Sequence, residues 1–377
     1  MRTRRLVAIA GTVLVAALAA MTVVPPWTMA MLVVGVAVPE LSPLLALATL
    51  LWLPACLLLL RGDRRGQAIL GAALLAAAGV SLRPLAGFGS VAERAGTQLG
   101  AAAPKFSFGA LLRGGQHTGG ITERAIAYAA RDGSPLTMRL YRGRMPGSRP
   151  TVIVIYGGAW RGGDATQGAR MSRALASRGF TVAAIDYRHA LRFAHPSQLD
   201  DVRLSLELLR DSSEAWGIDT ARLALLGRSA GGHLAELAAF TPGGIPVRAV
   251  VAFYAPFDLV QGYVDRPSPD PLDVRAVLRD FIGGTPAEQG TRYRDASPSS
   301  HVRPGLPPVL LLYGAHDHAV KASFNRRAAE ELRGARARVV QVELPWAEHG
   351  FDLAPGGLGA QLAEWTVARF LSRELGP

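Results

Sequence analysis

The chain has 377 residues, of which 49% are hydrophobic, and a formal net charge of +12. This length exceeds that of one compact domain, so we expect one sizeable domain with an appended segment. The charge does not indicate nucleic-acid binding, because almost all basic residues are arginines scattered among acidic residues. Cys56 is the only cysteine and lies in an apolar run, which excludes an intrachain disulfide, a thiolate nucleophile and a cysteine-based metal site.

Residues 1–83 have the composition of a membrane anchor. Three stretches contain no charged side chain: residues 6–39, 41–60 and 66–82. Stretches of this length are explained by a lipid environment or by a signal peptide. We predict transmembrane spans at about 6–24, 41–60 and 66–82, whereas the segment 27–38 is too short to cross a bilayer alone.

The arginines that flank these spans predict the orientation of the anchor. They are Arg2, Arg4 and Arg5 before the first span, and Arg61, Arg64 and Arg65 between the second and third spans. Positively charged loops stay in the cytoplasm, so three spans leave the rest of the chain outside it. If residues 6–24 are instead a signal peptide cleaved near residues 17–19, the rest of the chain still lies outside the cytoplasm. A fourth span would reverse the orientation, and a third interpretation is that these runs are buried core helices.

Beyond the anchor, residues 84–120 are rich in Gly and Ala without sustained periodicity, and we interpret them as a linker or partial lid. Residues 121–377 then alternate between short apolar runs and amphipathic segments such as 198–216 and 321–333. The predicted strands are 125–129, 138–141, 151–156, 180–185, 222–226, 247–253, 308–313 and 339–344. This alternation predicts an α/β domain, with a mainly parallel sheet covered on both faces and an antiparallel first pair of strands.

The sharpest motif is Gly227-Arg228-Ser229-Ala230-Gly231, which follows a predicted strand and precedes a helix-like segment. G-x-S-x-G in this context indicates a nucleophilic serine on a sharp turn. The positions two residues before and after the serine need glycine, because strand and helix nearly collide there. Ser229 is therefore the candidate nucleophile, and the N–H of Ala230 is a candidate donor to an oxyanion. An ordinary glycine-rich turn with a capping serine is the alternative.

A second motif, Tyr156-Gly157-Gly158-Ala159-Trp160, follows the strand predicted at 151–156. A tetrahedral oxyanion needs two backbone donors, and the second one normally comes from the loop after the third strand. Gly158 and Ala159 are the candidates, because glycine lets the chain turn its N–H groups inward and the small alanine leaves space for an acyl carbon. Alone this motif is weak, since a glycine pair after a strand is common.

The catalytic acid should follow a late strand, and Asp317 does so, in the turn after the strand 308–313. Asp258, after the preceding strand, is the competing acid, because the chain order Ser, Asp, His fits either one.

The base should lie after the last strand, where His349 follows the strand 339–344. His316 and His318 are too close in sequence to Asp317 to bridge it to the serine. His233, one turn into the helix behind the nucleophile, is interpreted as structural. No cluster of His, Asp and Glu has convincing metal spacing, and the chemistry of such a triad requires no cofactor.

In these motifs the chain resembles the hormone-sensitive-lipase-like carboxylesterases and their kynurenine-formamidase and feruloyl- or acetyl-esterase relatives. The resemblance covers about residues 121–375. It is carried by Gly157 to Arg161, Gly163-Asp164, Asp186-Tyr187-Arg188, Asp200-Asp201-Val202, Gly227 to His233, Gly314, Asp317 and His349-Gly350-Phe351. The family usually has His before the glycine pair, where this chain has Tyr156.

The resemblance implies an α/β-hydrolase fold and a serine carboxylesterase that forms an acyl-enzyme on Ser229. We expect the segment 261–303 to cap the site and Trp160, Phe257 and Tyr263 to line an apolar acyl pocket. The expected substrate is a lipid or short acyl ester at the outer surface of the bilayer. The alternatives are a serine peptidase or amidase on the same fold, and a binding module without catalysis. Oligomeric state stays open.

Overall fold

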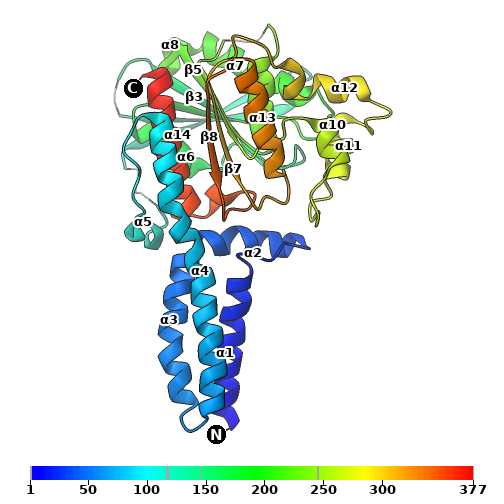
Figure 1. Ribbon diagram of the computed structural model, residues 1–377. Coiled ribbons are helices and arrows are strands. Elements are labelled where there is room, and N and C mark those ends of the chain that lie inside the picture. Colours follow the sequence, from blue (N-terminus) through cyan, green and yellow to red (C-terminus); the bar gives the residue numbers. More distant parts are fainter. Residues whose placement is uncertain (1, 116–118, 145, 244–245, 377) are drawn as a thin grey trace.

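The computed structural model describes residues 2–115, 119–144, 146–243 and 246–376. It has two parts, a narrow helical bundle and a larger α/β domain above it (Figure 1). The bundle consists of α1 (Arg2–Ala20), α3 (Ser42–Leu59) and the first half of α4 (Arg64–Leu99). Each of these three helices is long and apolar enough to cross a membrane.

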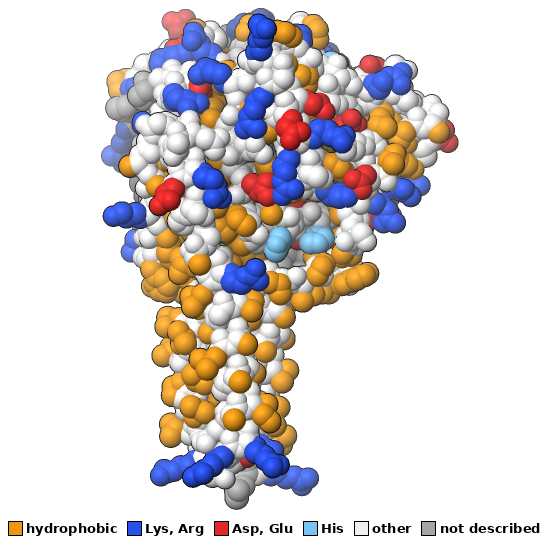
Figure 2. Space-filling view, in the orientation of Figure 1, with side chains coloured by type: hydrophobic (Ala, Val, Ile, Leu, Met, Phe, Trp, Pro, Cys, Tyr) orange, Lys and Arg blue, Asp and Glu red, His pale blue; other side chains and the backbone are white. Residues whose placement is uncertain are grey.

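The surface of the bundle is apolar. A small core of Ala8, Cys56, Leu60 and Leu74 holds the three helices together. The larger side chains on the outside, among them Leu14, Leu51, Leu58 and Ile69, are exposed. Figure 2 shows hydrophobic side chains over most of the bundle surface that faces the viewer. An apolar surface of this size is stable in lipid and unfavourable in water.

Helix α2 (Met29–Glu40) lies across the end of the bundle, between the bundle and the α/β domain (Figure 1). The hydroxyl of Thr28 caps its first turn by accepting a hydrogen bond from the backbone N–H of Met31 at 3.2 Å. At its other end, the side chain of Glu40 is buried. In Figure 1 the axis of α2 runs crosswise to the three long helices.

Helix α4 differs from the sequence prediction, which placed a linker at 84–120. The helix continues through Pro84 to Leu99, and ends at Gly100, whose left-handed backbone (φ 60°) terminates it. The apolar residues Phe88, Val91, Ala92, Ala95 and Leu99 belong to the main core. They recur at helical spacing, so one helix joins the bundle rigidly to the α/β domain. Within the predicted linker, α5 (Phe108–Leu112) is a further short helix.

The α/β domain is built on one sheet of eight strands in the order β1-β2-β4-β3-β5-β6-β7-β8. The strands are β1 (Ile121–Ala129), β2 (Pro135–Gly143), β3 (Arg149–Ile155), β4 (Thr181–Ile185), β5 (Ile218–Arg228), β6 (Ala249–Phe253), β7 (Val309–Gly314) and β8 (Val339–Leu344). β1 and β2 are antiparallel, β2 is antiparallel to β4, and the other neighbours are parallel. The carboxyl ends of the parallel strands therefore share one edge.

Helices cover both faces of the sheet, as predicted. One face packs against α6 (Ala169–Ser177), α14 (Leu358–Leu375) and the upper half of α4. The other packs against α7 (Ser197–Asp211), α9 (Ala230–Phe240) and α13 (Ala322–Gly334), and α8 (Ser213–Trp216) follows α7 (Figure 1). Strands β4, β6 and β7 are buried along their whole length, which explains why they read as continuous apolar runs.

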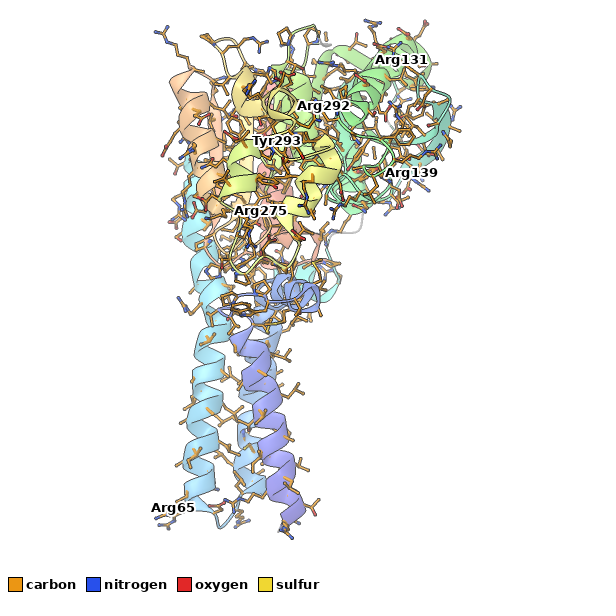
Figure 3. The ribbon with its side chains drawn as sticks, turned by 90° about the vertical axis from the view of Figure 1, so that its right-hand side faces the viewer. Arg65, Arg131, Arg139, Arg275, Arg292 and Tyr293 are labelled. Atoms are coloured by element: carbon orange, nitrogen blue, oxygen red, sulfur yellow. The ribbon has the colours of Figure 1, made fainter. Side chains whose placement is uncertain are left out.

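A cap lies between β6 and β7, in the interval where the sequence predicted one. It contains α10 (Leu259–Val264), α11 (Val274–Ile282), α12 (Gly290–Asp295) and the short helix η1 (Pro298–His301). Figure 3 shows Arg275, Arg292 and Tyr293 of this cap above the bundle, with Arg65 at the far end of the bundle. The cap therefore lies on the side of the α/β domain that faces the viewer in Figure 3.

Candidate active site

Ser229 occupies the turn between β5 and α9, with φ 51° and ψ −121°. A serine with this backbone is strained, and such strain persists only where the surroundings hold it. A Cβ on Gly227 would overlap the carbonyl oxygen of Gly231, and one on Gly231 would overlap that of Ile155. The flanking glycines are therefore required by space, for the reason predicted from the motif. The turn exposes Ser229 to a cavity.

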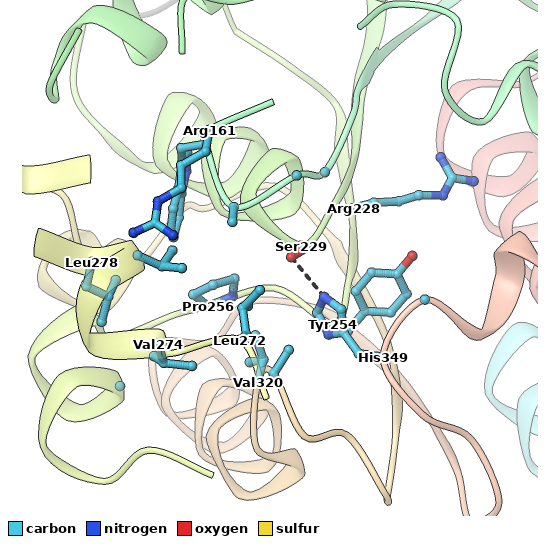
Figure 4. A pocket seen from close by; sticks show the side chains of 18 of the residues that line it. Arg161, Arg228, Ser229, Tyr254, Pro256, Leu272, Val274, Leu278, Val320 and His349 are labelled. Carbon is cyan, nitrogen blue, oxygen red and sulfur yellow. Dashed lines mark hydrogen bonds between the residues drawn. The ribbon is translucent and has the colours of Figure 1, made fainter. Parts of the chain in front are cut away.

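His349 and Asp317 meet Ser229 at the same edge of the sheet. The Nε2 atom of His349 lies 2.9 Å from Ser229 Oγ, the bond drawn in Figure 4. Its Nδ1 atom lies 2.8 Å from Asp317 Oδ2. The other carboxylate oxygen of Asp317 accepts backbone N–H bonds from Ala319 at 2.8 Å and Val320 at 2.7 Å. Asp317 is thus held from both sides, and the structure brings together the three residues selected from sequence.

The competing residues lie elsewhere. Asp258 caps α10 by accepting the N–H of Gln261 at 2.9 Å, and it is Asp317 that binds His349. His318 pairs with Glu348, its Nδ1 lying 2.6 Å from the carboxylate. The Nε2 of the buried His233 lies 2.6 Å from the carbonyl oxygen of Ala296, and burial lowers the pKa of His233 to about 3. It therefore packs as a neutral side chain between α9 and the cap.

Electrostatics favour protonation of His349. Burial is the largest single effect and lowers the pKa of His349. The charge and hydrogen bond of Asp317, together with the charges of Glu348 and Asp352, more than offset it. The net result is a pKa above the ordinary histidine value. An imidazole in this environment is a stronger base than one in water, which suits it to accept the proton of a hydroxyl group.

The loop after β3 supplies backbone donors. Gly158 and Ala159 both line the cavity beside Ser229 and have positive φ, 136° and 54°. Among the described residues their N–H groups donate to no protein acceptor. Ala230 is the first residue of α9, where helix N–H groups have no partner within the helix and carry partial positive charge. Two of the three predicted donors therefore line the cavity, and the third, Ala230, directly follows Ser229 at the start of α9.

Tyr156, which stands where the family usually has His, orients this loop through its phenol. The hydroxyl donates to Asp186 Oδ1 at 2.6 Å and lies 2.8 Å from His189 Nε2. Its ring stacks on Tyr187, with centroids 4.4 Å apart. A Cβ on Gly163 would overlap the Tyr156 ring, so the glycine makes room for the larger aromatic side chain. The phenol thus ties the oxyanion loop to the segment after β4.

The cavity has a volume of about 590 Å³, within the range of small-molecule sites. Besides Ser229 and His349, its lining includes the loop after β3 and apolar side chains of the cap and of α2, among them Leu272, Val274, Leu278, Met29 and Leu32. Figure 4 shows the cap residues opposite the serine.

The predicted aromatic lining is wrong for two of its three residues. Trp160 lines the cavity and stacks on Phe281, with centroids 4.2 Å apart. Phe257 is buried in the main core, whereas its neighbours Pro256 and Asp258 line the cavity. Tyr263 packs against Tyr293 of the cap, with centroids 6.0 Å apart. The lining is therefore more aliphatic than predicted.

Sequence reasoning missed a buried network behind the triad. Asp352 Oδ2 accepts from Arg228 Nε at 2.6 Å, and Oδ1 accepts from the hydroxyl of Tyr254 at 2.6 Å. The Tyr254 ring lies against His349, with centroids 4.5 Å apart. Arg228 is the residue before the nucleophile, so this network joins the serine turn to the histidine loop. Its signal in sequence was an Asp three residues after His349, which resembles any surface acid.

Glu348 is a second residue that sequence reasoning missed. Its Oε1 accepts the backbone N–H groups of His318 at 2.7 Å and of His349 at 2.8 Å. It therefore joins the acid turn to the base loop. Within the described residues, no group of three or more His, Cys, Asp or Glu side chains is arranged to hold a metal ion.

The sheet order, the strained serine turn and the cap between β6 and β7 define the domain as an α/β-hydrolase. Residues 140–332, more than half of the chain, match the family model BD-FAE. The chain belongs to the BD-FAE family.

Two curated relatives carry esterase names. The chain is 33% identical over 243 residues to esterase LipC and 31% identical over 241 residues to the probable carboxylic ester hydrolase LipM, both of Mycobacterium tuberculosis. These matches cover 59% and 60% of this chain and 58% and 55% of those proteins. The chain thus spans less than two thirds of the length of these relatives.

The fold has close counterparts among solved structures. The structure of a bacterial heroin esterase matches with a TM-score of 0.61 and 24% identity, over 69% of this chain and 86% of that one. At this identity the likeness concerns the fold.

Proposed function

We propose that the protein hydrolyses carboxylic esters through an acyl-enzyme on Ser229, with His349 as base and Asp317 as the acid that orients it. The proposal rests on the two hydrogen bonds that join Ser229 to His349 and His349 to Asp317 beside an apolar cavity. The esterase names of LipC and LipM support ester substrates.

In the first half of the reaction, His349 Nε2 takes the proton of Ser229 as Oγ attacks the acyl carbon. The electron pair of the C=O bond moves to the oxygen, which accepts hydrogen bonds from the N–H groups of Gly158 or Ala159 and of Ala230. When the intermediate collapses, the alcohol leaves with the proton from Nε2.

In the second half, water replaces the alcohol. His349 takes a proton from water as its oxygen attacks the acyl-serine, and the same N–H groups receive the developing charge. Collapse of this intermediate releases the carboxylic acid, and the proton on Nε2 returns to Ser229 Oγ. Throughout, Asp317 holds the imidazole in the tautomer with hydrogen on Nδ1 and stabilises its charged form.

A fluorophosphonate probe tests the nucleophile in the full-length protein. Wild type should be labelled and should hydrolyse p-nitrophenyl butyrate, whereas Ser229→Ala should lose both properties. Ser300→Ala, at an exposed serine in η1, is the matched control and should behave as wild type. Equal labelling of wild type and Ser229→Ala would show that Ser229 is not the nucleophile. The matching p-nitroanilide, tested beside the ester, distinguishes an esterase from an amidase.

We also propose that α1, α3 and residues 66–82 of α4 cross a bilayer, with the α/β domain on the extracytoplasmic side. The N-terminus lies at the end of the bundle away from the α/β domain (Figure 1), where Lys and Arg side chains gather (Figure 2) and where Arg65 is labelled in Figure 3. Arg5 pairs with Asp63, in the turn before α4, at 3.5 Å. This distribution follows the positive-inside rule. Topology reporters fused after Arg65 and at the C-terminus test it, and a cytoplasmic signal at the C-terminus would overturn the assigned orientation.

A further inference from the structure

The cavity beside Ser229 has one wall that does not belong to the α/β domain. Met29 and Leu32 of α2 line it, together with Pro267 and Leu272 from the cap loop 265–273. In Figure 1 this loop descends from the cap toward the free end of α2. The N-terminal segment 1–83 therefore contributes, through α2, to the site in which we propose that esters are hydrolysed.

Two lining residues show where the cavity reaches the surface. Met29 is 48% exposed, and Leu353, which follows the base loop, is 57% exposed, although both line the cavity. Leu32, one turn further along α2, is 7% exposed and lies deeper. The mouth is therefore at the level of α2, and apolar side chains form its rim.

Helix α2 lies at the boundary between the bundle and the α/β domain. It ends at Glu40, and the span α3 begins at Ser42, so α2 lies at the upper end of the spans. Val33 is 64% exposed and Trp27, just before the helix, is 70% exposed. No charged residue occurs between Leu6 and Pro39. An apolar helix with an exposed Trp at the end of a transmembrane bundle fits the interface between head groups and acyl chains.

Hydrogen bonds to Glu40 hold α2 against the α/β domain. Glu40 is fully buried and accepts hydrogen bonds from Trp346 Nε1 at 3.1 Å and from the backbone N–H of Gly359 at the start of α14. Any side chain at Gly357 would meet Glu40, since a Cβ there would lie 2.8 Å from the Glu40 Cβ. Trp346 precedes His349 by three residues, so α2 is anchored to the base loop.

We infer that the substrate is a bilayer-dissolved ester with a long aliphatic chain, which reaches Ser229 between α2 and the cap loop 265–273, in contact with Met29 and Leu32. The inference rests on the proposed ester hydrolysis. A substrate that diffuses laterally in the bilayer meets an apolar mouth at its own depth, so its chain leaves lipid for the cavity without crossing water. Polar esters gain nothing from such a wall.

The test uses the full-length protein in phosphatidylcholine vesicles. Leu32→Trp puts a larger side chain into the cavity. Val33→Trp puts the same side chain on the exposed side of the same helix and is the matched control. Three esters are compared: p-nitrophenyl butyrate, p-nitrophenyl palmitate with the long chain on the acyl side, and hexadecyl butyrate with the long chain on the alcohol side.

We expect Leu32→Trp to lower the kcat/KM of at least one long-chain ester, relative to that of p-nitrophenyl butyrate, by about tenfold or more. The ester affected shows which half of the substrate lies against α2. Val33→Trp should leave both ratios unchanged. Unchanged ratios in Leu32→Trp would overturn the inference. If Leu32→Trp loses fluorophosphonate labelling and therefore its folded site, Leu32→Ala takes its place, and unchanged ratios in that variant overturn the inference equally.

The two proposals fail in different ways. If ester hydrolysis is wrong, the wild-type protein neither cleaves p-nitrophenyl butyrate nor shows labelling that depends on Ser229. If only the membrane-side substrate is wrong, the wild-type protein is active and labelled, but its preference among the three esters does not respond to Leu32.

Discussion

The loops after β7 and β8 hold two neighbouring histidine–carboxylate pairs that differ in one respect. His349 Nδ1 lies 2.8 Å from Asp317, and His318 Nδ1 lies 2.6 Å from Glu348. Burial lowers the pKa of both histidines, but the partner carboxylate and neighbouring groups together more than offset it, so both pKa values are raised. Of the two, His349 has its Nε2 2.9 Å from Ser229 Oγ. A raised pKa alone therefore does not identify the base, whereas the position of the second nitrogen does.

The two pairs are also joined to each other. Glu348 accepts the backbone N–H groups of both His318 and His349. The pair that does not contact the serine thus holds the acid turn and the base loop in register. We interpret Glu348 and His318 as positioning residues and His349 and Asp317 as the reacting pair.

The largest expected contrast is between the two histidines. His349→Ala should lower kcat/KM for p-nitrophenyl butyrate by about 10⁴-fold or more, because no base remains for Ser229. His318→Ala should lower it by about tenfold or less, since it removes a support of the loop and leaves the triad in place. Losses of similar size in the two variants would contradict the division into a reacting and a positioning pair.

Substitution of Asp317 should likewise reduce activity more than substitution of Glu348, but the difference should be smaller than that between the two histidines. Asp317→Asn should reduce kcat by about 10³- to 10⁴-fold, because the amide favours the wrong tautomer of His349. Glu348→Gln keeps an acceptor for the two backbone N–H groups and should cost about tenfold or less. Steady-state kinetics at one pH above the acid limb measures both, and a greater loss in Glu348→Gln would reverse the assignment.

The pH profile sharpens the comparison further. His349 must be neutral to accept a proton, so kcat/KM should fall on acidification with a midpoint above the ordinary histidine pKa, because the pKa of His349 is raised. The charge of Glu348 is one cause of that rise. Glu348→Gln should therefore shift the acid limb to lower pH. A shift to higher pH, or no shift, in a profile of kcat/KM would contradict the prediction that the charge of Glu348 raises the pKa of His349.

Glu40 extends the comparison to a buried carboxylate that pairs with no histidine. Burial raises its pKa from 4.5 to about 8, although bonds from Gly359 and Trp346 oppose the rise. Between these values the folded state holds a proton that the unfolded state lacks, so this group's stabilising effect decreases as pH rises through the window. Glu40→Gln should therefore reduce the loss of stability between pH 5 and pH 8. Thermal unfolding midpoints in detergent at pH 5 and pH 8 measure it, and the same decline in both proteins would contradict the raised pKa.

Much of the α/β domain and its site could be predicted from sequence, because the requirements there are local. The glycines around Ser229 follow from the space at one turn. Asp317 and His349 follow from their positions after predicted strands, since parallel strands bring their carboxyl ends to one edge. The residues that support them were not predictable in this way. Asp352 lies 124 residues from Arg228 in the chain, and only the folded sheet brings the two together.

The prediction failed where packing outweighs local pattern. Arg83 and Pro84 indicate the end of a span, yet α4 continues to Leu99, because its apolar stripe packs against β8 and α14. Phe257 was predicted to line the acyl pocket, but it is buried in the core. The turn instead directs its neighbours Pro256 and Asp258 into the cavity.

By itself, the sequence determined which segments are apolar enough for a bilayer, which alternate as strands and helices, and which serine occupies a glycine-flanked turn. These properties depend on composition and on contacts between near neighbours in the chain. The tertiary structure alone decided that α2 forms a wall of the cavity and that Glu40 binds Trp346, 306 residues away. Such contacts depend on the shape of two surfaces, which is set by the packing of all the elements that carry them.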